Sequence, residues 1–338
     1  MSIWRAERVL VTGGAGYIGS HCCKALMQSG RLPIAYDNLS RGHADAVRWG
    51  PLITGDIRDP DRLAQALRDE RIDAVIHFAA LAYVGESVRD PLEYYDVNVN
   101  GMRTLLDAML EGGCKRIVFS SSCATYGTPA HLPITEDSAQ NPINPYGRTK
   151  LIGEWMLRDA AKAHGLRYAA LRYFNAAGAD PEGDLGERHA PETHLIPLAL
   201  MAAAGLGSPL QVFGTDYATP DGTCIRDYIH VSDLARAHLC ALDHLEGGGE
   251  NVALNLGTGR GASIFDVVAA VERVTGRGVP LRFGPRREGD PPELTADPTR
   301  AAELIGFAPA YRELDDMIAH AAPWFGLSAQ NQRGVASC

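Results

Sequence analysis

The chain has 338 residues, 46% of them hydrophobic and 22% charged, and its formal net charge is −9. This length can hold one large α/β unit or two coupled domains, and the negative charge argues against broad attraction to nucleic acid or to an acidic membrane surface. Seven cysteines, an odd number without Cys-x-x-Cys spacing, indicate neither a disulfide framework nor a zinc ribbon. The longest mostly apolar stretch, residues 195–206, is too short to span a bilayer. We therefore expect a cytoplasmic protein with no nucleic acid or membrane partner.

Short apolar runs alternate with helical patterns through the first half of the chain. In chain order we expect strand 8–12, helix 17–28, strand 32–36, helix 60–69, strand 74–78, helix 94–110, strand 116–119, helix 145–164 and strand 168–171. Gly30, Gly112 and Gly165 are the expected helix stops, and Asn144 is the expected N-cap before Pro145. The alternation predicts an α/β fold with a Rossmann-type, doubly wound parallel sheet.

The pattern changes after about residue 174. Glycine- and proline-rich stretches at 179–191, 214–222 and 284–292 separate isolated helices and short strands. We expect a first domain over residues 1–173 and a smaller, mixed α/β C-terminal domain over 174–338. Segments around 228–260 are expected to return to the first domain.

A glycine-rich turn follows the first expected strand. The spacing Gly13-x-x-Gly16-x-x-Gly19 brings backbone N–H groups and a helix N-terminus to a point where a pyrophosphate can bind. Asp37, at the end of the second strand, stands where a carboxylate can accept hydrogen bonds from ribose hydroxyls and repel a 2′-phosphate. The pattern predicts binding of NAD in preference to NADP. The alternative is a tight turn and a surface aspartate.

Tyr146 and Lys150 lie four residues apart, so they share one face of the expected helix 145–164. A nearby ammonium favours the phenolate, so we expect the pKa of Tyr146 to be lowered and the phenol to take a proton from a sugar hydroxyl. Ser122, after an apolar strand, would share that hydrogen bond. In the alternative reading, Tyr146 packs in the core, Lys150 is solvated and Ser122 caps a helix.

The glycine turn, the serine and the Tyr-x-x-x-Lys pair together resemble the extended short-chain dehydrogenase/reductase superfamily. Within it, residues 8–325 resemble the UDP-glucose 4-epimerases. The segments that carry this narrower resemblance are 38–40, 55–57, 77–80, 84–87, 91–95, 98–101, 171–175, 226–231, 255–257 and 286–290.

The resemblance implies NAD-dependent epimerisation of a UDP-sugar at C4. Tyr146 would remove the 4-hydroxyl proton while hydride passes to tightly held NAD, and the resulting 4-keto sugar would rotate before hydride returns. Ser122, Tyr146 and Lys150 are the implied catalytic residues. The implied NAD contacts are these three residues and Gly13, Gly16, Tyr17, Ile18, Gly19, Asp37, Asn38, Asp56, Ile57, Phe78, Ala79, Ala80, Asn98 and Phe174.

The same resemblance implies that the nucleotide, not the sugar, anchors the substrate. Arg226 and Arg287 would bind the diphosphate. The full implied substrate set is Ser122, Tyr146, Asn175, His194, Leu195, Phe213, Arg226, Tyr228, Arg287, Asp290 and Leu294. The resemblance also implies a homodimer formed through the helices that begin near Tyr94 and Pro145.

No metal is expected, because the histidines show no metal-ligand spacing. His77, His194 and His230 are expected to be packing or polar contacts.

Three residues depart from the common family pattern: Ala82, His194 and Leu294. Leu294 replaces a tyrosine that restricts the sugar pocket, so the interconversion of UDP-glucose and UDP-galactose has alternatives, UDP-N-acetylglucosamine and the pair UDP-xylose and UDP-arabinose. The stretch 121–127 resembles the enzymes that act on the pentose pair.

Two further functions compete with epimerisation. A nucleotide-sugar dehydratase would need an Asp-Glu pair after Ser122, where Cys123 and Ala124 stand. A non-catalytic NAD-binding regulator would not need Ser122, Tyr146 and Lys150 together.

Overall fold

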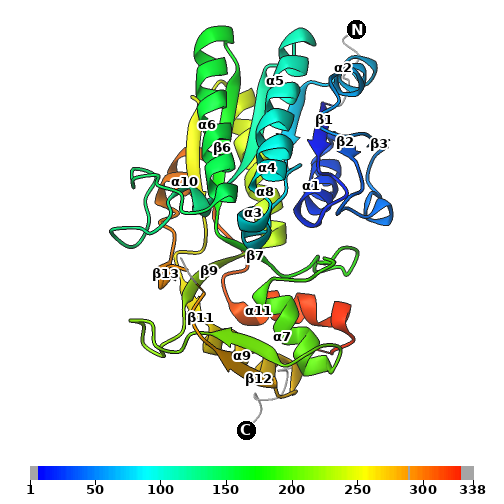
Figure 1. Cartoon of the computed structure of the whole chain (residues 1–338). Coiled ribbons are helices and arrows are strands. Elements are labelled where there is room, and N and C mark those ends of the chain that lie inside the picture. The colour runs from blue at the N-terminus through cyan, green and yellow to red at the C-terminus, as the bar shows by residue number, and fades with distance from the viewer. Residues whose placement is uncertain (1–6, 288–289, 329–338) are drawn as a thin grey trace.

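The computed structural model describes residues 7–287 and 290–328, and Figure 1 shows its two parts, a large sheet with its helices above and a smaller unit below. The large sheet has seven parallel strands. Their spatial order is β10 (Val252–Leu256), β6 (Arg167–Tyr173), β5 (Arg116–Ser122), β4 (Ala74–His77), β1 (Arg8–Thr12), β2 (Leu32–Asp37) and β3 (Leu52–Thr54). This arrangement confirms the predicted Rossmann-type fold.

Helices cover both faces of this sheet because the strands are buried on both sides. In β1, Val9 and Val11 face one core and Leu10 faces the other, as a side-chain period of two requires. The first core is completed by α1 (Tyr17–Gln28), α8 (Val231–Glu246) and α10 (Thr299–Ile305). The second is completed by α2 (Pro60–Asp69), α5 (Gly101–Glu111) and α6 (Pro145–His164).

The smaller unit has its own core and two small sheets. One sheet contains β7 (Asn175–Ala177), β9 (Ile225–His230), β11 (Gly261–Ser263) and β13 (Glu293–Leu294), and the other pairs β8 (Leu210–Phe213) with β12 (Leu281–Gly284). The helices α7 (Leu195–Ala204), α9 (Ile264–Thr275) and α11 (Leu314–Ala321) supply its apolar side chains. In sequence, α8 and β10 lie between β9 and β11, but β10 is a strand of the large sheet and α8 packs against that sheet.

Helix boundaries follow their local signals closely. The predicted helices 17–28, 60–69 and 145–164 match α1, α2 and α6. Asn144 caps α6, because its side-chain oxygen accepts a hydrogen bond from the N–H of Gly147 at 2.8 Å. Gly165 ends α6 with a left-handed φ of 69°.

The predicted helix 94–110 is in fact three segments: α4 (Pro91–Tyr95), a π turn over Asp96–Asn100, and α5. Such π turns often occur at functional sites. Within residues 8–171, one strand and one α-helix were not predicted: the edge strand β3, which has only three residues, and α3 (Val84–Arg89), which has six. Short elements of this kind carry too little periodicity to be detected.

Over the two described ranges, no helix combines the length and the apolar character that crossing a bilayer requires.

Candidate active site

The predicted cofactor residues gather where the parallel strands of the large sheet end. β1 ends before Gly13, β2 ends at Asp37, β4 ends just before Phe78, β5 ends at Ser122, and β6 ends just before Phe174. The strand order reverses between β1 and β4, which are neighbours in the sheet. Ligands of open α/β sheets bind outside the carboxyl ends of the strands at such a point.

The glycine turn packs too closely for side chains. The N–H of Gly13 donates to the carbonyl of Tyr36 at 2.8 Å, and the N–H of Gly16 donates to the carbonyl of Gly13 at 3.1 Å. A Cβ at Gly13 would lie 2.7 Å from the nitrogen of Ala79, and one at Gly19 would lie 2.1 Å from the oxygen of Gly13. The turn therefore brings backbone to the site and leaves no room for substitution.

The first turn of α1 presents its N–H groups at this edge of the sheet. Gly16 is the N-cap residue, and among the described residues no side chain caps this helix. The N–H groups at Tyr17 and Ile18 therefore suit an anionic ligand such as a pyrophosphate.

Gly13→Ala should destabilise the protein more than Gly30→Ala. Both glycines have positive φ, 73° and 85°, so an alanine strains the backbone at each. A Cβ at Gly30 would meet nothing within 4 Å, whereas a Cβ at Gly13 meets the backbone of Ala79. We expect an excess loss of about 1–3 kcal/mol at Gly13 from overpacking, measured by chemical denaturation. Equal losses in the two variants would contradict the close approach.

Asp37 is buried at the end of β2 beside the glycine turn. Its two carboxylate oxygens accept hydrogen bonds from the N–H groups of Ala15, at 3.0 Å, and Leu39, at 2.8 Å. Burial raises the pKa of Asp37, and these two hydrogen bonds oppose the rise. Each oxygen keeps a further lone pair, so the carboxylate fits ribose hydroxyls and disfavours a phosphate.

Two predicted cofactor residues use their side chains within the protein. The Tyr17 hydroxyl donates to the carbonyl of Gly178 at 2.6 Å and so links α1 to the segment after β7. The Asn98 amide, in the π turn, donates to the carbonyl of Leu81 at 3.0 Å and to the Thr149 hydroxyl at 3.0 Å, and accepts from the N–H of Leu81 at 2.8 Å. Asn98 therefore holds the loop after β4 against α6.

In the segment after β3, the side chains of the predicted cofactor residues Asp56 and Ile57 also contact other parts of the protein. The Asn38 amide donates to Asp56 at 3.1 Å, and Arg58 makes an ion pair with Asp56 at 2.9 Å, which holds the pKa of Asp56 well below its usual range. The Ile57 side chain is buried in the core, where it would contact any Cβ added at Gly101. A dinucleotide could contact Ile57 only through its backbone.

Tyr146 and Lys150 meet Ser122 at the junction of α6 and β5. The Lys150 ammonium donates to the carbonyl of Ser120 at 2.7 Å and lies 5.8 Å from the centroid of the Tyr146 ring. The Ser122 hydroxyl lies near the Tyr146 phenol, where it favours the phenolate, and it accepts a hydrogen bond from the N–H of Ala124 at 3.1 Å. All three catalytic candidates are buried.

The pKa values of Tyr146 and Lys150 differ from the expectation. Burial raises the pKa of Tyr146, and the nearby Ser122 hydroxyl only partly opposes the rise. Burial lowers the pKa of Lys150 to about 7. The predicted lowering of the Tyr146 pKa by Lys150 was therefore wrong for this structure, because desolvation dominates and the ammonium is directed toward Ser120.

Lys150 fits a ribose of the expected dinucleotide. It is 3% exposed, and an ammonium has three donors. Its one hydrogen bond within the described residues goes to the Ser120 carbonyl, a neutral acceptor. The hydroxyl groups of a ribose would accept hydrogen bonds from the remaining donors of the Lys150 ammonium.

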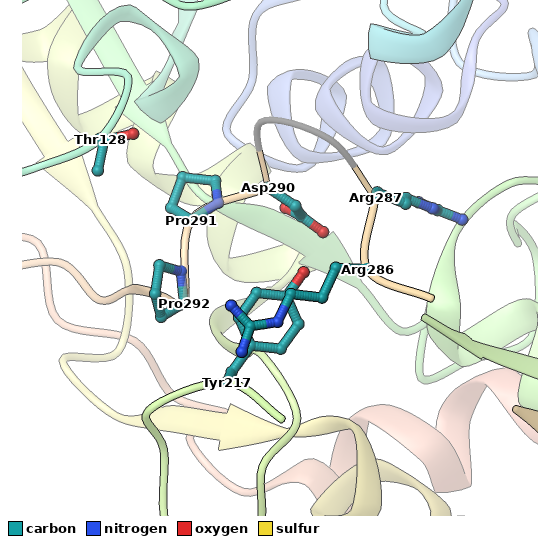
Figure 2. A pocket seen from close by; sticks show the side chains of 7 residues that line it. All are labelled: Thr128, Tyr217, Arg286, Arg287, Asp290, Pro291 and Pro292. Atoms are coloured by element: carbon teal, nitrogen blue, oxygen red, sulfur yellow. The ribbon is translucent and has the colours of Figure 1, made fainter. Parts of the chain in front are cut away.

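Arg287, one of the two arginines predicted to bind the diphosphate, lines a pocket of about 440 Å³. Figure 2 shows its lining, which comprises Thr128, Tyr217, Arg286, Arg287, Asp290, Pro291 and Pro292. Arg226, on β9, makes an ion pair with Asp290, and the Arg287 guanidinium lies 4.1 Å from the centroid of the Phe213 ring. Arg286 and Tyr217, which were not predicted, stack at 4.4 Å and form one wall (Figure 2).

Leu294 packs against a small apolar cluster that contains Phe174. Cys123, the residue after Ser122, packs against the same cluster. Asn175 and Tyr228 are paired residues of β7 and β9, and the Asn175 amide donates to the carbonyl of Asp227 at 3.1 Å.

His194 is the N-cap residue of α7. Its imidazole contacts Glu187, and the next residue, Leu195, begins α7.

The sequence analysis missed a buried ion pair between β6 and α6. Arg172 on β6 donates twice to Glu154, at 2.9 and 2.7 Å, and the Ser121 hydroxyl donates to the same carboxylate at 2.5 Å. Glu154 follows Lys150 by four residues, so it extends the inner face of α6. The four-residue spacing from Lys150 could have indicated that Glu154 also faces inward. A charged residue on an inward face needs a buried partner, so the sequence could have predicted an ion pair here.

Comparison with known proteins places the chain among sugar nucleotide enzymes. The model of the NAD dependent epimerase/dehydratase family matches residues 9–257. A UDP-glucose 4-epimerase of Rhizobium meliloti is 52% identical over 328 residues, which cover 97% of this chain and 99% of that protein.

Two solved structures have the same fold. The UDP-glucose 4-epimerase of Brucella ovis in complex with NAD has a TM-score of 0.94 and 60% identity, covering 96% of this chain and 100% of that one. The enzyme from Stenotrophomonas maltophila, with bound NAD and formylated UDP-arabinopyranose, has a TM-score of 0.91 and 43% identity, covering 95% and 98%. The chain therefore belongs to the NAD dependent epimerase/dehydratase family and, within it, to the UDP-glucose 4-epimerases.

Proposed function

We propose that this chain inverts C4 of a UDP-sugar with tightly bound NAD, acting on UDP-glucose and UDP-galactose. The observation that carries the proposal is the meeting of Ser122, Tyr146 and Lys150 beside the glycine turn. The residues around the turn fit NAD, and bound NAD supplies an acceptor that takes hydride from C4 and returns it.

Tyr146 is the proposed base for the sugar 4-hydroxyl. The nearby Ser122 hydroxyl favours the phenolate, and a protonated Lys150 held by ribose hydroxyls favours it further. Burial keeps water away from the proton path between Tyr146 and Ser122. Ser122 would stabilise the C4 oxygen as it becomes a carbonyl, and Tyr146 would return its proton to that oxygen to form the 4-hydroxyl of the other epimer.

The proposed anchor for the substrate is the diphosphate. Arg226 and Arg287 carry planar donors that suit phosphate oxygens, and both belong to the smaller unit. An anchor on the nucleotide leaves the 4-keto sugar free to rotate. We propose residues 1–173 as the NAD-binding domain and residues 174–338 as mainly the UDP-sugar domain, with α8 and β10 returning to the former.

The test of this function uses three substrates without added NAD. Purified protein is incubated separately with UDP-glucose, UDP-N-acetylglucosamine and UDP-xylose, and the C4 epimers are separated by chromatography. Release of UDP-galactose as the main product supports the proposal. A requirement for stoichiometric external NAD would indicate a dehydrogenase instead.

The second candidate substrate is the pentose pair UDP-xylose and UDP-arabinose. Leu294 favours it, because a leucine beside Phe174 and Cys123 alters the apolar wall near Ser122. The structure from Stenotrophomonas maltophila carries a UDP-arabinopyranose derivative. UDP-arabinose as the main product of the three-substrate test would favour this candidate over the hexose pair.

We also propose a homodimer in the cytoplasm, formed through α3, α4 and α6, which pack against one another. Each presents an apolar side chain to solvent: Val88 is 62% exposed, Leu92 is 78% exposed and Trp155 is 50% exposed. Exposed apolar groups on adjoining elements are typical of an interface. The six described cysteines are free, as a reducing compartment favours.

Leu92→Glu should convert the dimer to a monomer, because a carboxylate would be buried without a partner in the interface. The molar mass is measured by light scattering after gel filtration. Leu206→Glu is the matched control, since Leu206 is 63% exposed in the smaller unit, and its dimer should persist. A monomeric wild-type protein would contradict the proposed assembly.

A further inference from the structure

Four side chains converge in the loop that precedes α7. Glu187, His189, Glu192 and His194 each offer one ligand atom, and these atoms all lie within 4.8 Å of one another. None of the four belongs to the catalytic trio or to the glycine turn. The cluster combines two imidazoles with two carboxylates, a donor set that suits zinc.

The separations between these atoms suit a tetrahedral ion. Zinc bonds of about 2.0–2.1 Å require neighbouring ligand atoms to lie about 3.3 Å apart. The Nδ1 atom of His189 is 3.2 Å from Glu187 Oε1 and 3.6 Å from Glu192 Oε2. The Nδ1 atom of His194 is 3.8 Å from Glu192 Oε1 and is in contact with Glu187. Small side-chain movements would bring all four atoms to zinc-binding distance.

A buried nitrogen without a well-formed hydrogen bond also points to a ligand. The Nδ1 atom of His189 is shielded from solvent, and its contact with Glu187 Oε1 at 3.2 Å lacks hydrogen-bond geometry. The ring is held edge-on between Tyr17, at 6.2 Å, and Tyr83, at 5.9 Å, so its direction is set by packing. An unsatisfied buried polar atom is costly, and a metal bond would satisfy it.

The charge of the cluster can be balanced in two ways. The side chains of Glu187 and Glu192 are only 4% and 7% exposed, and the ion pairs that they make within the described residues are with His189 and His194. One divalent ion would balance the two carboxylates and leave both imidazoles neutral.

A second cluster of carboxylates in the same region already has a cationic partner. Asp180, Glu182 and Asp184 also lie close together, but the Lys24 ammonium donates to all three, at 2.7, 2.6 and 2.9 Å. A cation therefore already occupies the centre of that group, which makes it a control for the other cluster.

We propose that Glu187, His189, Glu192 and His194 bind one zinc ion that fixes the loop before α7 against Tyr17 and Tyr83. The site is structural, since all four protein ligands are used and none is left open for a substrate. Because Tyr17 lies in the first turn of α1, the ion would hold the smaller unit beside the glycine turn. This proposal does not depend on which sugar the protein accepts.

The test is a zinc titration of the full-length protein after dialysis against a chelator. Isothermal titration should give one tightly bound zinc per chain, and the bound ion should raise the melting temperature. His189→Gln and Glu192→Gln should each abolish the tight site, whereas Asp184→Asn, in the Lys24 cluster, should retain it. Circular dichroism confirms that each variant is folded.

Cobalt substitution of the wild-type protein gives a second readout that needs no variant. A tetrahedral site should give intense visible absorption bands that zinc abolishes by displacing the cobalt. Absence of stoichiometric zinc binding, a weak octahedral cobalt spectrum, or full zinc binding by both His189→Gln and Glu192→Gln would overturn the proposal. In each case the two histidines would instead balance the carboxylates as protonated partners.

Discussion

Tyr146→Phe should lower the turnover of UDP-sugar epimerisation by about 10²–10⁴-fold, the usual contribution of a general acid or base. The change removes one hydroxyl from a buried ring and leaves the ring's packing intact. Ser122 and Lys150 remain in place, so NAD and UDP should still bind. Turnover is measured by coupled assay, and binding of NAD and UDP by calorimetry.

Tyr168→Phe is the matched control for that variant. Tyr168 lies near the amino-terminal end of β6, whereas the catalytic trio gathers at the carboxyl edge of the sheet. The control also loses one phenolic hydroxyl, yet its turnover should equal that of the wild type. Near-normal turnover by Tyr146→Phe would exclude Tyr146 as the base.

Arg172→Ala should lower the free energy of unfolding by about 3–5 kcal/mol, because it leaves a buried carboxylate uncompensated. Arg172 and Glu154 are 4% and 3% exposed, and their two hydrogen bonds join β6 to α6. The unfolding free energy is measured by urea denaturation followed by tryptophan fluorescence. Activity should fall as well, because Ser121, next to the catalytic serine, donates to the same carboxylate.

Two further variants define the role of this ion pair. Arg103→Ala removes a pair with Asp107 whose side chains are 60% and 54% exposed, and it should cost less than about 1 kcal/mol. The double variant Glu154→Leu, Arg172→Met should recover much of the lost stability, since an apolar pair needs no charge partner. Equal losses from Arg172→Ala and Arg103→Ala would show that burial adds nothing to this interaction.

Local signals were sufficient for much of the large domain. The short apolar run at residues 8–12 and the glycine spacing after it predicted β1 and the turn, because both depend on short stretches of chain. The Asn144 cap and Gly165 predicted both ends of α6 for the same reason. The π turn at residues 96–100 could not be predicted, since its partners, Leu81 and Thr149, lie far away in sequence.

For the candidate site, too, the sequence predicted some features and tertiary packing decided others. Residue types and spacing alone identified Ser122, Tyr146 and Lys150 and placed them at one sheet edge, because parallel strands end together. Folding decided the pKa values of Tyr146 and Lys150, since desolvation depends on everything packed around these groups and is the largest cause of both shifts. Folding also decided which polar groups meet: Arg172 on β6 reaches Glu154 on α6, and the His189 ring lies against Tyr17 on α1. Such contacts join elements whose separation only tertiary packing sets.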